Sequence, residues 1–175
     1  MSTARASCGS LALVLALVLA LGCGGGATFA DRVYRDREAS YRVGELGPGW
    51  ERITMEGNDL AWHHEALGAV VQVNATCDPF QDVPLTALTN HLLIGFTERE
   101  TRSSETVPLD GREALRSHLV ARLDGVPREL LLYVLKKDTC TYDFALVAPP
   151  GDAYRGAEPA FERFVAGFTT EVASP

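Results

Sequence analysis

The sequence predicts an α+β domain with a six- to seven-stranded, mainly antiparallel sheet and helices packed across it. Residues 101–148 contain a series of segments in which apolar and polar residues alternate, and turn residues separate these segments. A helix is predicted on each side of this series, because apolar residues recur there at helical spacing. Strands in series with helices outside the series are typical of an α+β sandwich.

The chain begins with a segment typical of a bacterial export signal. Arg5 is followed by a purely apolar run of Leu, Val and Ala, from Leu11 to Leu21. This run is shorter than the ~20 apolar residues that span a bilayer, and small residues follow it, as in a cleaved signal peptide. The sequence Leu19-Ala20-Leu21-Gly22-Cys23 resembles the lipobox of bacterial lipoproteins, in which a small residue precedes an invariant cysteine. The resemblance implies a signal peptide over residues 1–22 and lipidation of Cys23, with acyl chains such as palmitate.

Two other interpretations of this segment remain open: an ordinary secretory signal cut after one of the glycines, and an uncleaved membrane anchor. The lipoprotein interpretation predicts a protein anchored by its acyl chains in the cell envelope of a Gram-negative-type bacterium. Gly24 follows the cysteine, and the absence of an aspartate there favours the outer membrane, facing the periplasm, over the inner membrane. The net charge of −7 argues against nucleic acid as a partner and against electrostatic docking on anionic lipid.

Two cysteines, Cys77 and Cys140, remain once Cys8 is removed with the signal and Cys23 is lipidated. Two such cysteines in an oxidising periplasm most often pair, so a disulfide between them is predicted. Two buried free thiols or a metal site are the alternatives, but no nearby His or Cys supplies the short ligand spacing of a zinc site. No cofactor and no metal is expected.

The domain is expected over residues 41–170, between a lipidated cysteine with a flexible tether at 23–40 and a tail at 171–175. The tether is expected because its residues are glycine-rich, then charged, and lack periodicity. Turn residues Gly47-Pro48-Gly49 lead into a strand at Trp50. Alternation predicts further strands over 59–64 and 69–76, joined by a turn at 66–68, with Cys77 on the apolar face of the second.

The first helix is expected to begin near Pro84, a favoured first helical residue, and to end at Gly95. Its apolar stripe consists of Leu85, Leu88 and Leu92.

The strands that follow are expected over 101–109, 113–123, 129–135 and 140–146. Asp110-Gly111 and Asp124-Gly125 are typical of hairpin turns, and 129–135 is apolar enough for a central strand covered on both faces. The strand 113–123 is expected to point one set of residues inward and another outward. The inward set is Leu115, Leu119, Ala121 and Leu123, and the outward set is Arg116, His118 and Arg122.

The last helix is expected to open at Glu158-Pro159, after Pro149-Pro150-Gly151 ends the sheet. Its stripe, expected to pack on the sheet, consists of Phe161, Phe164, Val165 and Phe168.

Three features together resemble the PsbP-like fold, an α/β/α sandwich. They are the entry strand at Gly47-Pro48-Gly49-Trp50, the long meander Gly111–Ala148 and the terminal helix with Phe161, Phe164 and Phe168. The superfamily includes a photosynthetic oxygen-evolving subunit, the DcrB-like bacterial lipoproteins and a Ran-binding nuclear import factor. The resemblance implies a domain that binds proteins or acts as an accessory subunit, without shared catalytic residues.

Two groups of polar residues are candidate sites. His63-His64-Glu65 does not favour a metal site, because alternate residues of a strand point to opposite faces. The outward residues Arg112, Arg116, His118 and Arg122 have two interpretations: a solvated sheet face, which is preferred, and a weak anion or partner patch.

The sequence contains no nucleophile elbow, no His-Glu-x-x-His and no phosphate loop. It therefore predicts a membrane-anchored, non-catalytic module that binds or assists an envelope protein. The alternative is a periplasmic carrier or sensor of a small ligand, which would require a sizeable apolar pocket between the sheet and a helix. An enzyme with an unrecognised site is the third possibility, and it would require titratable groups that converge in a cleft.

Overall fold

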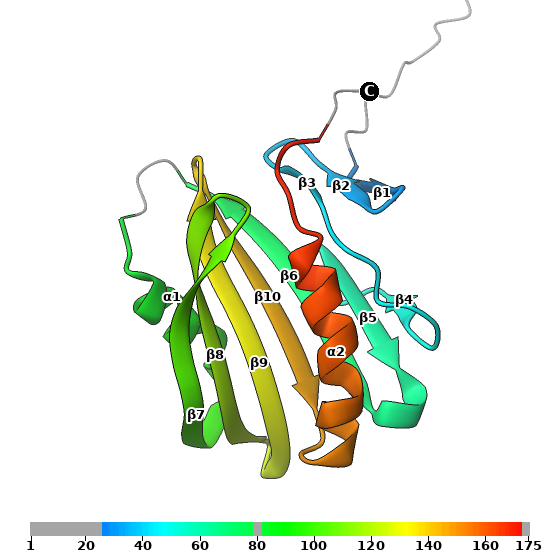
Figure 1. Cartoon of the computed structure of the whole chain (residues 1–175), viewed down its shortest axis with the longest axis vertical. Coiled ribbons are helices and arrows are strands. Elements are labelled where there is room, and N and C mark those ends of the chain that lie inside the picture. The colour runs from blue at the N-terminus through cyan, green and yellow to red at the C-terminus, as the bar shows by residue number, and fades with distance from the viewer. Residues whose placement is uncertain (1–25, 79–81, 173–175) are drawn as a thin grey trace, which may run out of the picture.

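The computed structural model describes residues 26–78 and 82–172 (Figure 1). The predicted signal peptide and Cys23 lie outside the described residues. Within these residues, seven antiparallel strands form the main sheet, in the order β4 (Glu51–Ile53), β5 (Leu60–His64), β6 (Ala69–Cys77), β10 (Cys140–Ala148), β9 (Val126–Lys137), β8 (Arg112–Leu123) and β7 (Phe96–Leu109). A smaller sheet contains β1 (Thr28–Ala30), β2 (Val33–Arg35) and β3 (Ser40–Arg42).

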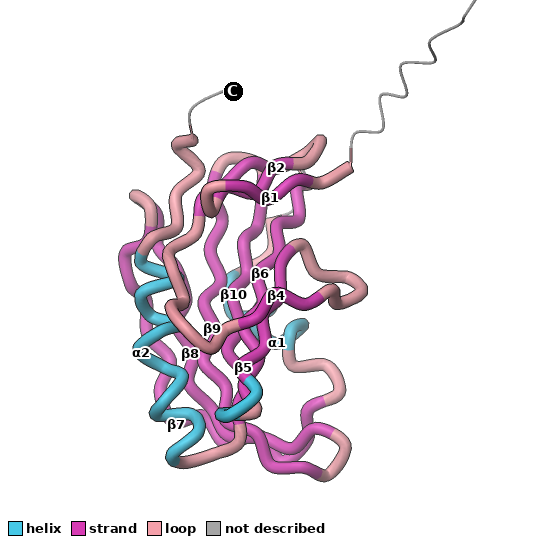
Figure 2. Tube along the Cα trace, turned by 90° about the vertical axis from the view of Figure 1, so that its right-hand side faces the viewer, coloured by secondary structure: helices cyan, strands magenta, loops and turns pink. Residues whose placement is uncertain are grey.

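The helices α1 (Leu85–Leu92) and α2 (Asp152–Ala166) lie on opposite faces of the main sheet, and a short 3-10 helix, η1 (Glu65–Leu67), joins β5 to β6. Figure 1 shows α2 in front of the sheet and α1 behind it, and Figure 2 shows the helices on either side of the strands. The predicted α+β sandwich of one main antiparallel sheet and packed helices is therefore confirmed.

The larger core fills the space between the sheet and α2. The four apolar residues of the predicted terminal stripe are all buried in this core, and Phe168 contacts Tyr142 and Phe144 of β10. The helix begins at Asp152, not at Glu158-Pro159 as expected. The expected start was wrong because Tyr154 and Ala157 extend the buried stripe by two turns, and their burial keeps Pro159 inside the helix.

The segment before residue 41 belongs largely to the fold, which corrects the expected flexible tether over residues 23–40. Residues 28–42 form the three strands of the small sheet, in which Val33 and Tyr34 are buried. The Tyr34 and Tyr41 rings are 5.0 Å apart, and Phe29 contacts Trp62 of β5 edge to face. Burial of these apolar and aromatic side chains offsets the entropy that a flexible tether would retain.

The expected inward and outward sets of β8 also need correction. Because helices cover both faces of the sheet, neither face of β8 is simply outward. Two of the odd-numbered residues, Leu119 and Ala121, belong to a second, smaller core on the side of α1. The even-numbered residues include Arg116 and His118, which lie beneath α2 with side chains only 18% and 22% exposed.

The edge strand β7 begins at Phe96, five residues before the expected start. Its first residues are mostly charged and exposed, so they carry no apolar alternation, yet their backbone pairs with β8 from Phe96↔Leu123 onward. Charged residues and register shifts are common on edge strands, where they hinder pairing with another chain.

Candidate functional site

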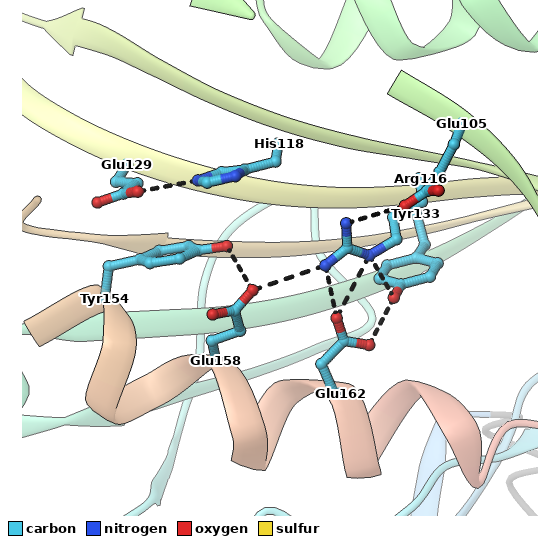
Figure 3. Close-up of polar contacts among 8 residues, drawn as sticks. All are labelled: Glu105, Arg116, His118, Glu129, Tyr133, Tyr154, Glu158 and Glu162. Atoms are coloured by element: carbon cyan, nitrogen blue, oxygen red, sulfur yellow. Dashed lines mark hydrogen bonds and ion pairs between the residues drawn. The ribbon is translucent and has the colours of Figure 1, made fainter. Parts of the chain in front are cut away.

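Polar side chains from the sheet and from α2 form one connected network between the two layers (Figure 3). At its centre is Arg116 of β8, whose Nη2 lies 2.8 Å from Glu162 Oε1 and 3.6 Å from Glu158 Oε1. Its Nε donates a hydrogen bond of 3.0 Å to the Tyr133 hydroxyl, which in turn donates to Glu162 Oε2 over 2.5 Å. Glu105 of β7 completes the set of partners, 3.3 Å from Arg116 Nη1.

His118, two residues along the same face of β8, makes a second group of contacts. Its Nε2 lies 2.8 Å from Glu129 Oε1, and its ring stacks on Tyr154 of α2 with a centroid distance of 4.9 Å. The other oxygen of Glu129 accepts a hydrogen bond of 3.0 Å from the backbone N–H of Gly151, just before α2 begins. His118 and Glu129 therefore hold the start of the helix, while Arg116 holds its middle.

The protonation states of Arg116 and Tyr133 are those of a stable ion pair and not of a proton-transfer site. Burial alone would lower the pKa of Arg116, but its hydrogen bonds with Glu162 and Tyr133 leave that pKa above the ordinary value. Burial, followed by the hydrogen bond to Glu162, raises the pKa of the Tyr133 hydroxyl. The guanidinium therefore stays charged and the phenol stays neutral at physiological pH, so neither group is poised to exchange protons.

The structure does not form the basic patch expected from Arg112, Arg116, His118 and Arg122. Arg116 and His118 contact glutamates, and Arg122 Nε lies 2.8 Å from Glu98 Oε2. Arg112 lies at the opposite end of β8 from Arg122. An incoming anion would have to displace these carboxylates. The pattern of β8 alone could not reveal them, because they belong to other strands and to α2.

Cys77 and Cys140 form a disulfide and lie opposite each other where β6 and β10 pair. Both face the larger core, as the sequence predicted. His63 and His64 end β5, and the His64 ring meets Trp50 edge to face, while Glu65 belongs to η1. Among the described residues, no three His, Cys, Asp or Glu side chains gather into a set that could ligate a metal.

A different feature, an apolar groove, lies on the opposite face of the sheet, beside α1. Its volume is ≈ 340 Å³. Its floor comes from three neighbouring strands, in which Val147 of β10 is paired with Val70 of β6 and with Leu130 of β9. Ala145 and Leu132 form the next row of the floor. We call this hollow the α1-face groove.

The groove is open because α1 is short. The helix has eight residues, and its stripe of Leu85, Leu88 and Leu92 is only partly buried. Leu92 forms one wall of the groove, and Phe96 and Leu123 lie on the same side. The helix therefore covers only part of the apolar face beneath it.

Two polar side chains line the otherwise apolar groove, Arg128 of β9 and Gln72 of β6. Both are partly buried, and neither has an ion pair or a side-chain hydrogen bond to another described residue. Arg128 shares the α1 side of β9 with Leu130 and lies one row nearer to the end of the sheet, at the edge of the groove floor.

A smaller hollow of ≈ 150 Å³ adjoins the groove along the same face and shares Leu92 as a wall. It contains Asp143 of β10, which is 8% exposed and accepts a hydrogen bond of 3.2 Å from Asn74 Nδ2. Burial raises the pKa of Asp143 to about 6, despite the opposing effect of the Asn74 hydrogen bond. The two hollows thus place a buried carboxyl at one end of an apolar surface and an arginine at the other.

The sequence contains a partial signal for the groove. Residues 69–71 and 144–148 are apolar at successive positions, so β6 and β10 carry apolar residues on both faces, as was expected only for 129–135. The second apolar face indicated that something should cover it. Which part of this second face stays uncovered could not be predicted, because it depends on where α1 ends.

Within the described residues, no helix has the length and apolar character needed to cross a bilayer. No protein-family model matches the chain, and no curated protein is similar to it in sequence.

Solved structures of similar fold were found. The solution structure of the cyanobacterial PsbP protein, CyanoP, from Synechocystis sp. PCC 6803 has a TM-score of 0.52 at 15% identity, with 93% of this chain and 96% of that chain covered. A crystal structure from Bacteroides thetaiotaomicron has a TM-score of 0.53 at 12% identity, with 75% of this chain but only 45% of that chain covered. LpqN of Mycobacterium tuberculosis, described as involved in cell envelope biogenesis, has a TM-score of 0.48 at 10% identity, covering 82% of this chain and 88% of that one.

At these identities the similarity concerns the fold alone. The resemblance to the PsbP-like α/β/α sandwich, expected from the entry strand, the meander and the terminal helix, is confirmed at the level of the fold.

Proposed function

We propose that this protein is an envelope lipoprotein whose domain is a non-catalytic binding module, and that it holds a small ligand with an apolar part in the α1-face groove. The observation that carries the proposal is the groove itself. It is walled mostly by apolar side chains, its volume of ≈ 340 Å³ lies in the range of small-molecule sites, and it lies between the sheet and a helix. The small-ligand alternative raised from the sequence required a pocket of this kind.

The polar network under α2 supports the non-catalytic part of the proposal. Its charged groups contact one another, and its contacts link β8 and β9 to α2. Groups of this kind stabilise the docking of a helix. A catalytic site would instead present a nucleophile or a general base to an open cleft.

A second function, binding of a protein partner by an accessory module, is favoured by one observation. Ile94 and Val126 are large apolar side chains that are 69% and 47% exposed. Ile94 lies two residues before Phe96, and Val126 is paired with Leu123, so both lie next to groove residues along the chain or across the sheet. A partner could cover both side chains and the mouth of the groove together.

The first experiment compares small molecules recovered from the full-length lipoprotein with those recovered from a variant whose groove is filled. The protein is purified from membranes, extracted with organic solvent and analysed by mass spectrometry. Val70→Trp places a large ring on the partly buried floor of the groove. Thr101→Trp is the matched control, because Thr101 is an exposed residue of the edge strand β7 that lies outside the groove lining. We expect a stoichiometric ligand in the wild type and in Thr101→Trp, and its loss in Val70→Trp.

Crosslinking in intact cells from a photoreactive residue at position 94, followed by purification and mass spectrometry, tests the second function. A single envelope protein crosslinked in high yield, with no extractable small molecule, would favour the accessory role over the carrier role. An identical extract from Val70→Trp and from the wild type would contradict the assignment of the groove as the binding site.

A further inference from the structure

We infer that the α1-face groove binds a single-chain anionic amphiphile, with its acidic head group against Arg128 and its acyl chain across the apolar floor. This inference rests on the proposed function, since it assigns the ligand class of the same groove. Four observations lead to it: the apolar floor, the unpaired arginine, the position of Asp143 and the volume of the groove.

The floor suits an aliphatic chain. Val70, Val147 and Leu130 form one row across three strands, and Ala145 and Leu132 form the next, so an apolar surface extends across the sheet and not along one strand. Methylene groups displace water from such a surface favourably, because apolar area is then removed from water on both sides. Gln72 is the polar group on the floor, opposite Ala145.

Arg128 supplies the charge that selects the head group. It is partly buried at the edge of the groove, and no carboxylate among the described residues forms an ion pair with it. Arg116 and Arg122 of the neighbouring strand β8 differ, because each of them forms an ion pair with a glutamate. A planar guanidinium without a partner at the edge of an apolar groove is suited to bind a carboxylate or a similar oxyanion through two parallel hydrogen bonds.

Asp143 determines the orientation. Its buried carboxyl lies in the adjoining hollow beyond Leu92, on the other side of the groove from Arg128. An acidic head group placed near Asp143 would repel its ionised form, whereas the same head group at Arg128 is attracted. The ligand therefore enters with its tail over the floor and its head group at the end of the sheet.

The size of the groove suits one chain. Its volume of ≈ 340 Å³ lies at the lower end of the range of small-molecule sites. A groove of this size accommodates one acyl chain of medium length better than the two full chains of a phospholipid. We therefore assign a monomeric fatty acid as the ligand class, and not a lipid of the bilayer surface.

The test uses the full-length lipoprotein in nanodiscs and two photoreactive probes of equal length. One probe is dodecanoate with a diazirine near its methyl end, and the other is the corresponding dodecylammonium. We expect the dodecanoate probe to label groove peptides at least tenfold more strongly than the ammonium probe. Arg128→Gln should reduce dodecanoate labelling about tenfold, Arg128→Lys should restore part of it, and Arg128→Glu should make the ammonium probe the better ligand.

Two further variants separate the inference from the proposed function. Arg112→Gln removes an exposed arginine outside the groove and should leave labelling unchanged. Val70→Trp should abolish groove labelling by both probes while far-UV circular dichroism stays the same, and Leu123→Trp serves in its place if Val70→Trp does not fold. Equal labelling by both probes, or an equal loss of both with Arg128→Gln, would overturn the head-group assignment and keep the groove as a binding site. No labelling of groove peptides by either probe would overturn both.

Discussion

Arg116 of β8 and Glu162 of α2 form an ion pair of 2.8 Å. The pair joins β8, which lies next to the edge strand β7, to the helix that packs mainly on β10. The Arg116 side chain is 18% exposed and that of Glu162 is 38% exposed, so water only partly screens the pair. Glu162→Gln should therefore lower the free energy of unfolding by about 1–2 kcal/mol, because Arg116 loses a charged acceptor and Tyr133 loses part of its strongest hydrogen bond. Urea unfolding followed by circular dichroism measures the change.

The matched control for that variant is Glu98→Gln. Glu98 pairs with Arg122 over the same distance of 2.8 Å, but the two side chains are 71% and 41% exposed. Exposed ion pairs contribute about 0–1 kcal/mol, so this variant should be close to the wild type. Equal losses in the two variants would show that the network under α2 contributes no more than a surface contact.

A second prediction concerns the buried carboxyl beside the groove. Burial raises the pKa of Asp143 to about 6, so ionisation of this group opposes folding at neutral pH. Asp143→Asn keeps an acceptor for Asn74 and cannot ionise. It should therefore raise the free energy of unfolding at about pH 7.5 by on the order of 2 kcal/mol.

The sign of the pH dependence distinguishes this effect from a change in packing. The native state binds its proton more tightly than the unfolded state, so the penalty is absent below the unfolded pKa and grows as pH rises towards the folded pKa. The gain from Asp143→Asn should accordingly shrink as the pH falls from about 7.5 to about 4. Asp124→Asn, at an exposed hairpin turn, is the control and should show no such trend. A gain that stays constant over this range would contradict the assigned cause.

Most of the architecture could be predicted from apolar periodicity and turn residues. The Asp-Gly turns define the hairpins 110–111 and 124–125, and the stripe ending at Phe168 places α2 on the sheet. The start of α2 could not be predicted in the same way, because Pro159 is typical of a first turn and only the burial of Tyr154 explains the earlier start. A local pattern does not contain this information about tertiary packing.

The residues of the candidate site were harder to predict than the fold. Arg116 and His118 were correctly placed on one face of β8, but their carboxylate partners are on other strands and on α2. Arg128 could not be singled out from the sequence, because there it is one of several charged residues near a turn. Its significance depends on the apolar floor that β6 and β10 bring beside it.

A third prediction concerns the disulfide. Cys77 and Cys140 close a loop with a sequence separation of 63, and a cross-link over a loop of this length stabilises by on the order of 4 kcal/mol in the chain-entropy model. The double variant Cys77→Ala, Cys140→Ala should unfold at lower urea concentration and should be insensitive to added dithiothreitol. Thiol labelling of the non-reduced, denatured wild type should find both cysteines blocked, and two reactive thiols would show that the bond does not form in the cell.

A fourth prediction concerns the anchor at Cys23, which lies outside the described residues. Several acyl chains give a stable anchor, whereas one gives only reversible binding. Cys23→Ser should therefore release the protein from membranes or leave the precursor uncleaved, and it should abolish incorporation of radioactive palmitate. Unchanged retention with normal processing would contradict the lipobox interpretation and favour an ordinary signal or an uncleaved anchor.

The last prediction tests whether the N-terminal segment is part of the folded domain. Gly44 follows β3 and lies directly against α2, where its N–H donates a hydrogen bond of 2.8 Å to the carbonyl oxygen of Phe164. A Cβ at this position would lie 2.2 Å from the carbonyl oxygen of Arg163 and 2.9 Å from the Cα of Phe164. Both are backbone atoms of α2, so Gly44→Ala forces the helix and the segment apart.

Gly44→Ala should lower the free energy of unfolding by about 3 kcal/mol, as expected for overpacking that the backbone cannot relieve. It should also increase proteolysis within residues 28–42, because the small sheet depends on this contact. Gly26→Ala, where no atom lies within 4 Å of the added Cβ, is the control and should match the wild type. Equal protease resistance of the two variants would mean that the small sheet does not depend on its contact with α2 and is held by its other contacts, such as that of Phe29 with Trp62.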